Sequence, residues 1–279
     1  MIAASFLLIS VMAKIISPFG LWAQREKPIF PFSEPSHYAL GISYFLVCLS
    51  VILNGWRLFV LMLGCVIIFI LVKSLTLVIA LLLCIACRVN IKILLGLLVM
   101  LPLFFIAPLD FTYYTSRLDF SSSTENLSSL VWIFGWQQAI HEASESLWLG
   151  SGFQQFSANA NINDAAEKIE ILTGSYPNTL DGGSMAAKMI GEWGVVGLIC
   201  ICFWMVRFLL SFIKLRKIAR IHEANFHLVM AHAGVVSYAI EMLVRGIGYF
   251  SPGSYFLFVS IGIFIFGKNY PDKCLPRSI

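Results

Sequence analysis

Long apolar runs, separated by short clusters of charge, constrain this chain more than any other feature of its sequence. Hydrophobic residues make up 59% of the chain and charged residues only 12%, with a mean hydropathy of +0.85. A soluble globular domain has about 25% charged residues. Because lipid cannot satisfy backbone polar groups, a run that crosses the bilayer must be helical, and about 20 residues long unless neighbours shield it. The sequence therefore predicts an all-α polytopic membrane protein.

Eight apolar segments are candidate transmembrane helices. They cover residues 2–17, 36–53, 56–72, 75–87, 91–108, 185–210, 226–244 and 254–266. The first segment lacks a basic start and an A-x-A exit, which favours a retained span over a cleaved signal peptide. Only Lys73 and Ser74 separate the third segment from the short fourth one, so these two are predicted to form a tight hairpin.

Basic residues near the span ends predict the orientation. The densest cluster lies at 214–220, which predicts a cytoplasmic loop there, with both termini in the cytoplasm. The chain then divides into N-terminal transmembrane helices (1–109), a large external loop (110–184), and C-terminal transmembrane helices with a cytoplasmic tail (185–279). The net charge of +4 is interpreted as this topology and not as a nucleic-acid footprint.

Cysteine placement favours packing over redox chemistry. Six of the seven cysteines lie inside apolar runs, and Cys274 lies in the tail. Cys84 and Cys87 have CxxC spacing, but no histidine or acidic residue accompanies them, so a metal or redox role is disfavoured. No structural disulfide is expected.

The external loop combines aromatic rings with amide and acidic side chains. Residues 132–147 predict a helix and residues 161–172 a second one, with turns at Tyr176-Pro177-Asn178 and Asp181-Gly182-Gly183. The apolar face of the first helix consists of Trp132, Phe134, Trp136, Ala139, Ile140 and Ala143. Its other sides carry the polar residues Gln137, Gln138, His141 and Glu142. This mixture suits a sugar. An amphipathic helix lying on the membrane surface fits equally well.

Several charges lie at span ends, where an ionised group needs a partner or a wet cavity. Lys188 and Glu192 are spaced i, i+4, and a mutual ion pair is their simpler interpretation. Arg245 either extends to lipid headgroups or binds a diphosphate, and Arg117 shares that ambiguity. Ser36 is a candidate helix cap, with Pro35 ending the preceding loop.

Four sequence blocks in a fixed order, with a fifth block in support, carry a resemblance to a known family. They are Ser33-Glu34-Pro35-Ser36-His37; Lys73-Ser74-Leu75-Thr76; Gly135-Trp136 through Gly152-Phe153-Gln154-Gln155; Asp181-Gly182-Gly183-Ser184 through Glu192-Trp193-Gly194-Val195-Val196-Gly197-Leu198; and Arg245-Gly246-Ile247-Gly248-Tyr249-Phe250. On these blocks the chain resembles bacterial Wzy-type polysaccharide repeat-unit polymerases, in the superfamily that includes the O-antigen ligases.

The resemblance implies a GT-C-like glycosyltransferase architecture, independent of metals and cofactors, at the periplasmic face of the inner membrane. A growing O-antigen or exopolysaccharide chain on undecaprenyl diphosphate would pass to the non-reducing-end hydroxyl of an incoming lipid-linked repeat unit. Undecaprenyl diphosphate would leave. The implied partners are these lipid-linked glycans, the bilayer and, as a further candidate, a chain-length regulator. No nucleic-acid partner is implied.

Chemistry of this kind assigns three roles to residues of this chain. Cations stabilise the leaving diphosphate, a base and a positioning group serve the acceptor hydroxyl, and other groups hold sugar. For the diphosphate, the candidate cations are Arg117 and Arg245, with Lys73 and Lys188 in reserve. For the acceptor hydroxyl, the candidates are Glu34, His141 or Asp181. For binding the sugar, they are Trp136, Gln154 and Gln155. A lone loop histidine is usually solvated, so proton transfer by His141 is the less common alternative.

Two departures from the family pattern bear on function. Family members usually have several more spans before the Glu34-Pro35-Ser36 block, so a truncated, non-catalytic homologue is one alternative. The ligase branch has a His-Asn pair where this chain has Gly183-Ser184, which favours a polymerase over a ligase. A polysaccharide transporter is the remaining alternative. It predicts internal repeats and broken helices, and no internal repeat is seen in the sequence.

Overall fold

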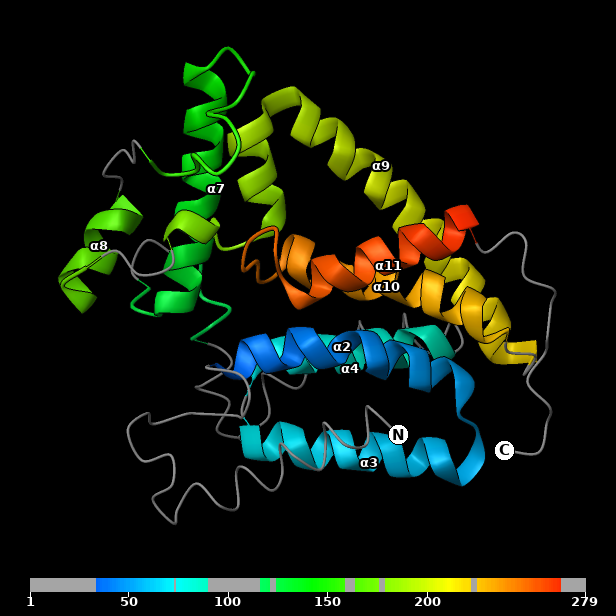
Figure 1. Cartoon of the computed structure of the whole chain (residues 1–279). Coiled ribbons are helices and arrows are strands. Elements are labelled where there is room, and N and C mark those ends of the chain that lie inside the picture. The colour runs from blue at the N-terminus through cyan, green and yellow to red at the C-terminus, as the bar shows by residue number, and fades with distance from the viewer. Residues whose placement is uncertain are drawn as a thin grey trace. The chain divides into compact units, whose positions relative to one another are not determined.

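All regular secondary structure in the described part of the chain is helical. The computed structural model describes residues 34–72, 74–89, 116–120, 124–158, 164–175, 179–221 and 225–266. Within these ranges it has eight α-helices and one short 3-10 helix (Figure 1): α2 (Pro35–Ile52), α3 (Gly55–Val72), α4 (Leu75–Arg88), α7 (Leu127–Glu145), α8 (Asp164–Thr173), η2 (Thr179–Asp181), α9 (Met185–Ile221), α10 (Phe226–Leu243) and α11 (Pro252–Phe266). Six of the predicted spans coincide with a helix. The spans predicted at 2–17 and 91–108 lie outside the described residues.

Three of these helices are long and apolar enough to cross a membrane. They are α2, α9 and α10, whereas α4, α11 and the Gly55–Cys65 part of α3 are shorter apolar helices. In the most apolar window of α9 only 17% of the residues are buried, which suits a surface in contact with lipid. The structure thus supports a membrane protein with up to three spans in its described part.

The chain forms two compact units. The first comprises Met1–Ile91, Phe208–Ile240 and Pro252–Ile279, and the second comprises Lys92–Arg207 and Glu241–Ser251. The boundaries fall inside α9 and near the end of α10, so each of these helices contributes to both units.

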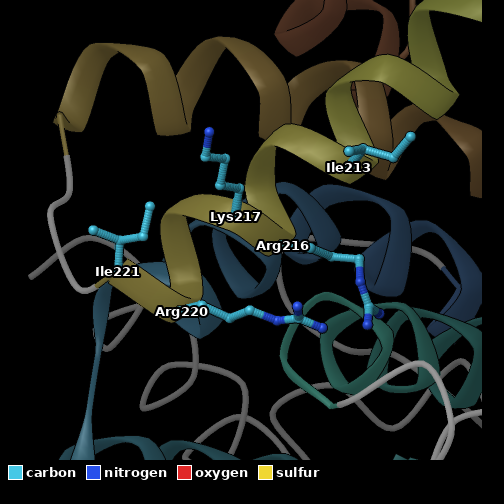
Figure 2. A pocket seen from close by; sticks show the side chains of 5 residues that line it. All are labelled: Ile213, Arg216, Lys217, Arg220 and Ile221. Carbon is cyan, nitrogen blue, oxygen red and sulfur yellow. The ribbon is translucent and has the colours of Figure 1, made fainter.

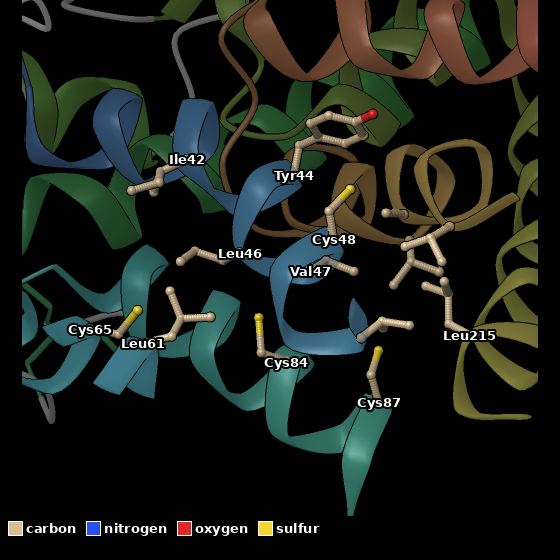
Figure 3. Close-up of a cluster of buried hydrophobic side chains, with 14 of the residues drawn as sticks. Ile42, Tyr44, Leu46, Val47, Cys48, Leu61, Cys65, Cys84, Cys87 and Leu215 are labelled. Atoms are coloured by element: carbon tan, nitrogen blue, oxygen red, sulfur yellow. The ribbon is translucent and has the colours of Figure 1, made fainter. Parts of the chain in front are cut away.

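Apolar side chains of α2, α3, α4, α9 and α10 form the core of the first unit (Figure 3). Cys84 and Cys87 are buried in this core, as the packing interpretation of their CxxC spacing predicts. Helix α11 packs against the same core, where the ring of Tyr44 stacks on Phe256 with a centroid distance of 4.2 Å.

Arginine side chains hold three helix ends together in the first unit. Arg88, the last residue of α4, donates to the carbonyls of Ser50 and Val51 near the end of α2. Arg216 of α9 donates to the carbonyl of Val89, just after α4, at 2.6 Å. The last carbonyls of a helix have no intrahelical donor, and a cation there also complements the helix dipole. The C-terminal ends of α2, α4 and α9 therefore lie at one end of this unit.

Two predicted helix boundaries are wrong. The helix α2 begins at Pro35, with Glu34 at the cap position, so Ser36 lies inside the helix and donates to the Glu34 carboxylate at 3.1 Å. Proline is favoured at the first helical position because its missing N–H has no partner there anyway. The helix α9 continues to Ile221, so the predicted loop at 214–220 is helical. Lysine and arginine are good helix formers, and Leu215 is buried in the first unit's core.

The second unit is built on α7, whose cap residue Asn126 accepts from the backbone N–H groups of Ser128 and Ser129. Helix α8 packs three apolar residues on α7, and the cluster consists of Leu130, Val131, Phe134, Ala165, Ala166 and Ile169. The helix at 132–147 is thus confirmed, but its polar face is partly wrong. Gln138 is completely buried, whereas Ile140 is exposed.

Candidate functional site

Helix α9 breaks sharply at Gly194, where φ is 54° and ψ is −126° (Figure 1). The backbone groups freed by this break bond to the loop that follows α7. Val195 N–H donates to the Trp148 carbonyl at 2.9 Å, and Gly152 N–H donates to the Glu192 carbonyl at 3.0 Å. Buried backbone groups need such partners, so the break and this loop stabilise one another. A β-carbon at Gly194 would overlap the Trp148 carbonyl.

Two carboxylates hold the loop at 150–157. Glu142 of α7 accepts from Ser157 N–H at 2.7 Å and from the Ser151 hydroxyl at 2.9 Å. Glu192 of α9, with 1% of its surface exposed, accepts from Phe156 N–H at 3.3 Å. Hydrogen bonds to charged groups are the stronger ones, so these contacts fix the loop between the two helices.

Three aromatic rings from separate segments meet beside this loop. Phe153 lies 5.4 Å from Tyr249 and 6.0 Å from Trp193 between ring centroids. The indole N–H of Trp193 donates to the Tyr249 hydroxyl at 2.9 Å. Phe153 is 51% exposed and Trp193 is 41% exposed, so these three residues, here called the aromatic group, present ring surface outward. Aromatic faces of this kind combine an apolar surface with polar edges.

Lys188 places a buried positive charge next to the aromatic group. Its Nζ lies 5.6 Å from the centre of the Tyr249 ring and 3.8 Å from Oε1 of Glu192, and it donates to the Leu180 carbonyl at 2.8 Å. The predicted ion pair between Lys188 and Glu192 is confirmed. Oε2 of Glu192 is buried and has no hydrogen-bond partner among the described residues. A buried polar atom of this kind is where a water or a ligand hydroxyl is expected.

The segment from Arg245 to Tyr249 lies against the turn at 181–183. Gly246 N–H donates to the Gly183 carbonyl at 3.0 Å, and a β-carbon at Gly248 would lie 3.4 Å from Oδ1 of Asp181. Asp181 therefore lies beside the short segment that begins at the half-buried Arg245 and ends at Tyr249. This confirms the turn predicted at 181–183 and places Asp181 beside the segment that carries Arg245.

Arg117 is anchored on the first turns of α7. Its carbonyl accepts from the Ser129 hydroxyl at 3.0 Å, and the nearby Phe120 ring lies 5.1 Å from the ring of Trp132. The Trp132 indole N–H donates in turn to the Leu243 carbonyl at 3.2 Å, two residues before Arg245. Trp132 thus connects the two segments that carry these arginines.

The remaining predicted site residues of the second unit occupy different surroundings. Trp136 packs on the cluster that contains Phe156, and its buried indole nitrogen has no hydrogen-bond partner among the described residues. Gln154 and Gln155 are exposed on the fixed loop. His141 is half-buried on α7, and its carbonyl accepts from the Ser144 hydroxyl.

Glu34 and Lys73 belong to the first unit. The Glu34 carboxylate accepts from the Ser36 hydroxyl and lies 3.8 Å from Nε2 of His37. Lys73 lies outside the described residues. Among the residues that the structure does describe, no group of three His, Cys, Asp or Glu side chains is placed to hold a metal ion.

Four residues matter to this site without a role having been predicted for them: Glu142, Phe153, Trp193 and Tyr249. Phe153, Trp193 and Tyr249 each lie next to a glycine in the blocks that carry the family resemblance, and this position was the sequence signal for a role at the site. In the sequence Glu142 is one more polar residue on an amphipathic helix. Its hydrogen bonds to the loop depend on the fold and have no sequence signal. Comparisons with models of known protein families, with curated proteins and with solved structures return no match for this chain.

Proposed function

We propose that the chain is a metal-independent, lipid-linked glycosyltransferase that polymerises undecaprenyl-diphosphate-linked repeat units into O-antigen or exopolysaccharide. The observation that carries this proposal is the aromatic group beside Lys188. Sugar C–H faces stack on aromatic rings, while a diphosphate requires cations. A glycan joined to a diphosphate needs aromatic rings close to cations. The aromatic group lies beside the buried Lys188, and its Tyr249 stands four residues after the half-buried Arg245.

The cations act on the leaving group of the donor, which is undecaprenyl diphosphate. In the transfer, the acceptor hydroxyl oxygen bonds to the anomeric carbon of the growing chain, and the bond from that carbon to the diphosphate oxygen breaks. Negative charge develops on the departing undecaprenyl diphosphate, and preorganised cations stabilise it. Arg245 and Arg117 take this role, with Lys188, which is paired with Glu192, as a reserve cation beside the rings. Lys73 stays a candidate from the sequence.

The acceptor hydroxyl must lose a proton as the new bond forms. Asp181 is the best-supported base, because its carboxylate lies beside the segment that carries Arg245 and Tyr249. His141 and Glu34 stay as sequence candidates for the same role. Gln154 and Gln155 project from a loop that two carboxylates fix, and a fixed loop is what sugar positioning requires. Trp136, whose buried indole N–H has no partner among the residues that the structure describes, adds a donor.

The reaction is proposed for the periplasmic face of a bacterial inner membrane, with both termini of this chain in the cytoplasm. Eight spans in a GT-C-like arrangement form part of the same proposal. The apolar helices α2, α9 and α10 support the membrane location.

Complementation tests the proposal. A polymerase-deficient strain that makes this protein's own glycan is supplied with the wild-type chain, and surface polysaccharide is separated on a gel. The wild type should restore a ladder. Arg245→Ala and Arg117→Ala should give only single repeat units with normal membrane insertion, and lysine should restore little, since it lacks the bidentate geometry. The matched control is Arg57→Ala, which removes an exposed arginine of α3 and should keep the ladder. Wild-type ladders in both test variants would refute the diphosphate clamp.

The break in α9 favours a second candidate, a polysaccharide transporter, because transporter helices are often interrupted at their substrate sites. The two functions differ in where repeat units accumulate. Loss of a polymerase leaves single units on the cell surface, whereas loss of a transporter retains them inside. Units retained inside the cell would replace the polymerase proposal with this one.

A further inference from the structure

The last turns of α9 contain an open cavity of about 270 Å³, whose lining surface is mostly apolar and includes three basic residues (Figure 2). Five residues line it: Ile213, Arg216, Lys217, Arg220 and Ile221. Ile213, Lys217 and Ile221 follow one another at i, i+4 spacing and share one side of the helix, while Arg216 and Arg220 form the neighbouring row. The cavity therefore joins an apolar ridge to a row of guanidinium groups.

The position of the cavity along α9 corresponds to a membrane surface. From Val195, just after the break, to Ile213 the helix contains 19 residues, or roughly 28 Å at 1.5 Å per residue. The hydrocarbon core of a bilayer is about 30 Å thick. Exposed apolar side chains cover this stretch, including Phe203, Val206 and Leu209. If this stretch spans the hydrocarbon core, the basic cluster from Lys214 to Arg220 begins where the headgroups begin, and the half-buried Arg207 is the one charged residue inside the stretch.

The cations of the cavity divide between a structural and a binding role. Arg216 caps the carbonyls at the end of α4. Lys217 and Arg220 are exposed, and no ion pair joins them to a carboxylate in the described part of the chain. Unneutralised cations at a membrane surface attract anionic headgroups, at about 1 kcal/mol per residue.

We propose that this cavity binds the phosphate headgroup of an anionic membrane phospholipid. Lys217 and Arg220 contact the phosphate, and an acyl chain follows the apolar surface that begins at Ile213. That continuous apolar surface is the reason for choosing a lipid over free phosphate. Because Arg216 joins α9 to α4, and Arg88 joins α4 to α2, the lipid stabilises the end of the unit where three helices finish. This site is independent of the glycan chemistry proposed for the second unit.

Native mass spectrometry of the full chain in detergent tests the proposal. Phosphatidylglycerol and phosphatidylcholine with identical acyl chains are titrated separately. We expect phosphatidylglycerol to bind more tightly, and Lys217→Gln combined with Arg220→Gln to weaken it roughly twenty-fivefold. The charge-retaining pair Lys217→Arg and Arg220→Lys should bind within about threefold of wild type, which keeps the test valid if the neutral pair fails to fold.

The matched control is Lys214→Gln, which removes an exposed lysine of the same helix that does not line the cavity. It should change binding by less than about twofold. An equal loss in this control would reduce the effect to general surface charge and overturn the site. Equal binding of both lipids by the wild type, or displacement of the lipid by equimolar inorganic phosphate, would overturn it too.

Discussion

At the residue scale, Glu142 shows how one side chain of α7 determines the form of a loop. Its two carboxylate oxygens accept from Ser157 N–H, from the Ser151 hydroxyl and from the amide of Gln138. Glutamine has nearly the same shape but no charge, and it keeps Ser157 N–H bonded with its N–H₂ group turned to the Ser151 hydroxyl. Glu142→Gln therefore replaces charge-assisted hydrogen bonds with weaker neutral ones. We expect a loss of about 1–3 kcal/mol in the free energy of unfolding and shorter polysaccharide ladders. Thermal unfolding of the purified protein, followed by tryptophan fluorescence, measures the first effect.

The control for this change is Glu145→Gln on the same helix. Glu145 is exposed, and surface substitutions usually stay within about 0.5 kcal/mol. Equal effects of the two substitutions would mean that the loop does not depend on the Glu142 carboxylate.

At the scale of elements, the break in α9 is the feature that most shapes the candidate site. Gly194 has a positive φ, which strains any residue with a β-carbon, and a β-carbon there would also overlap the Trp148 carbonyl. Gly194→Ala should therefore detach the loop at 148–158 from α9. We expect limited proteolysis of the purified protein to cleave this loop at least about tenfold faster.

Gly262→Ala provides the comparison, since a β-carbon at Gly262 of α11 would meet nothing within 4 Å. Cleavage of the loop at the wild-type rate in Gly194→Ala would show that the break survives without glycine.

The same elements show what a sequence can and cannot predict here. Apolar runs predict the helices well, because burial in lipid or protein requires apolar length, and six such runs are helical. The break at Gly194 was not predicted. Glycine inside an apolar run fits an unbroken span, and the bonds that stabilise the break come from Trp148 and Gly152, more than 40 positions earlier. The sequence also predicted that Gln138 lies on the polar side of α7. That prediction was wrong, because contacts with residues distant in the sequence bury it. The charged ends of spans, by contrast, identified Lys188 and Glu192 correctly as a pair.

At the scale of the whole molecule, the topology is a prediction that labelling can test. Lys214 begins the basic end of α9, and Gln154 lies on the loop at 150–157. In a Cys274→Ser background, Gln154→Cys and Lys214→Cys are treated with a charged, membrane-impermeant thiol reagent. Exposed Cys200 and Cys202 lie within the apolar part of α9, where lipid excludes such a reagent.

We expect Gln154→Cys to react in intact cells whose outer membrane admits the reagent, and Lys214→Cys to react only after the inner membrane is opened. The basic residues favour the cytoplasmic side, and the length of α9 after Gly194 is sufficient to cross the bilayer. The reverse pattern would invert the topology and move the proposed glycan site to the cytoplasm, where polymerisation on the periplasmic face is impossible. Reaction of both variants in intact cells would mean that α9 does not cross the membrane, and both the polymerase and the lipid-site proposals would then lose their common basis.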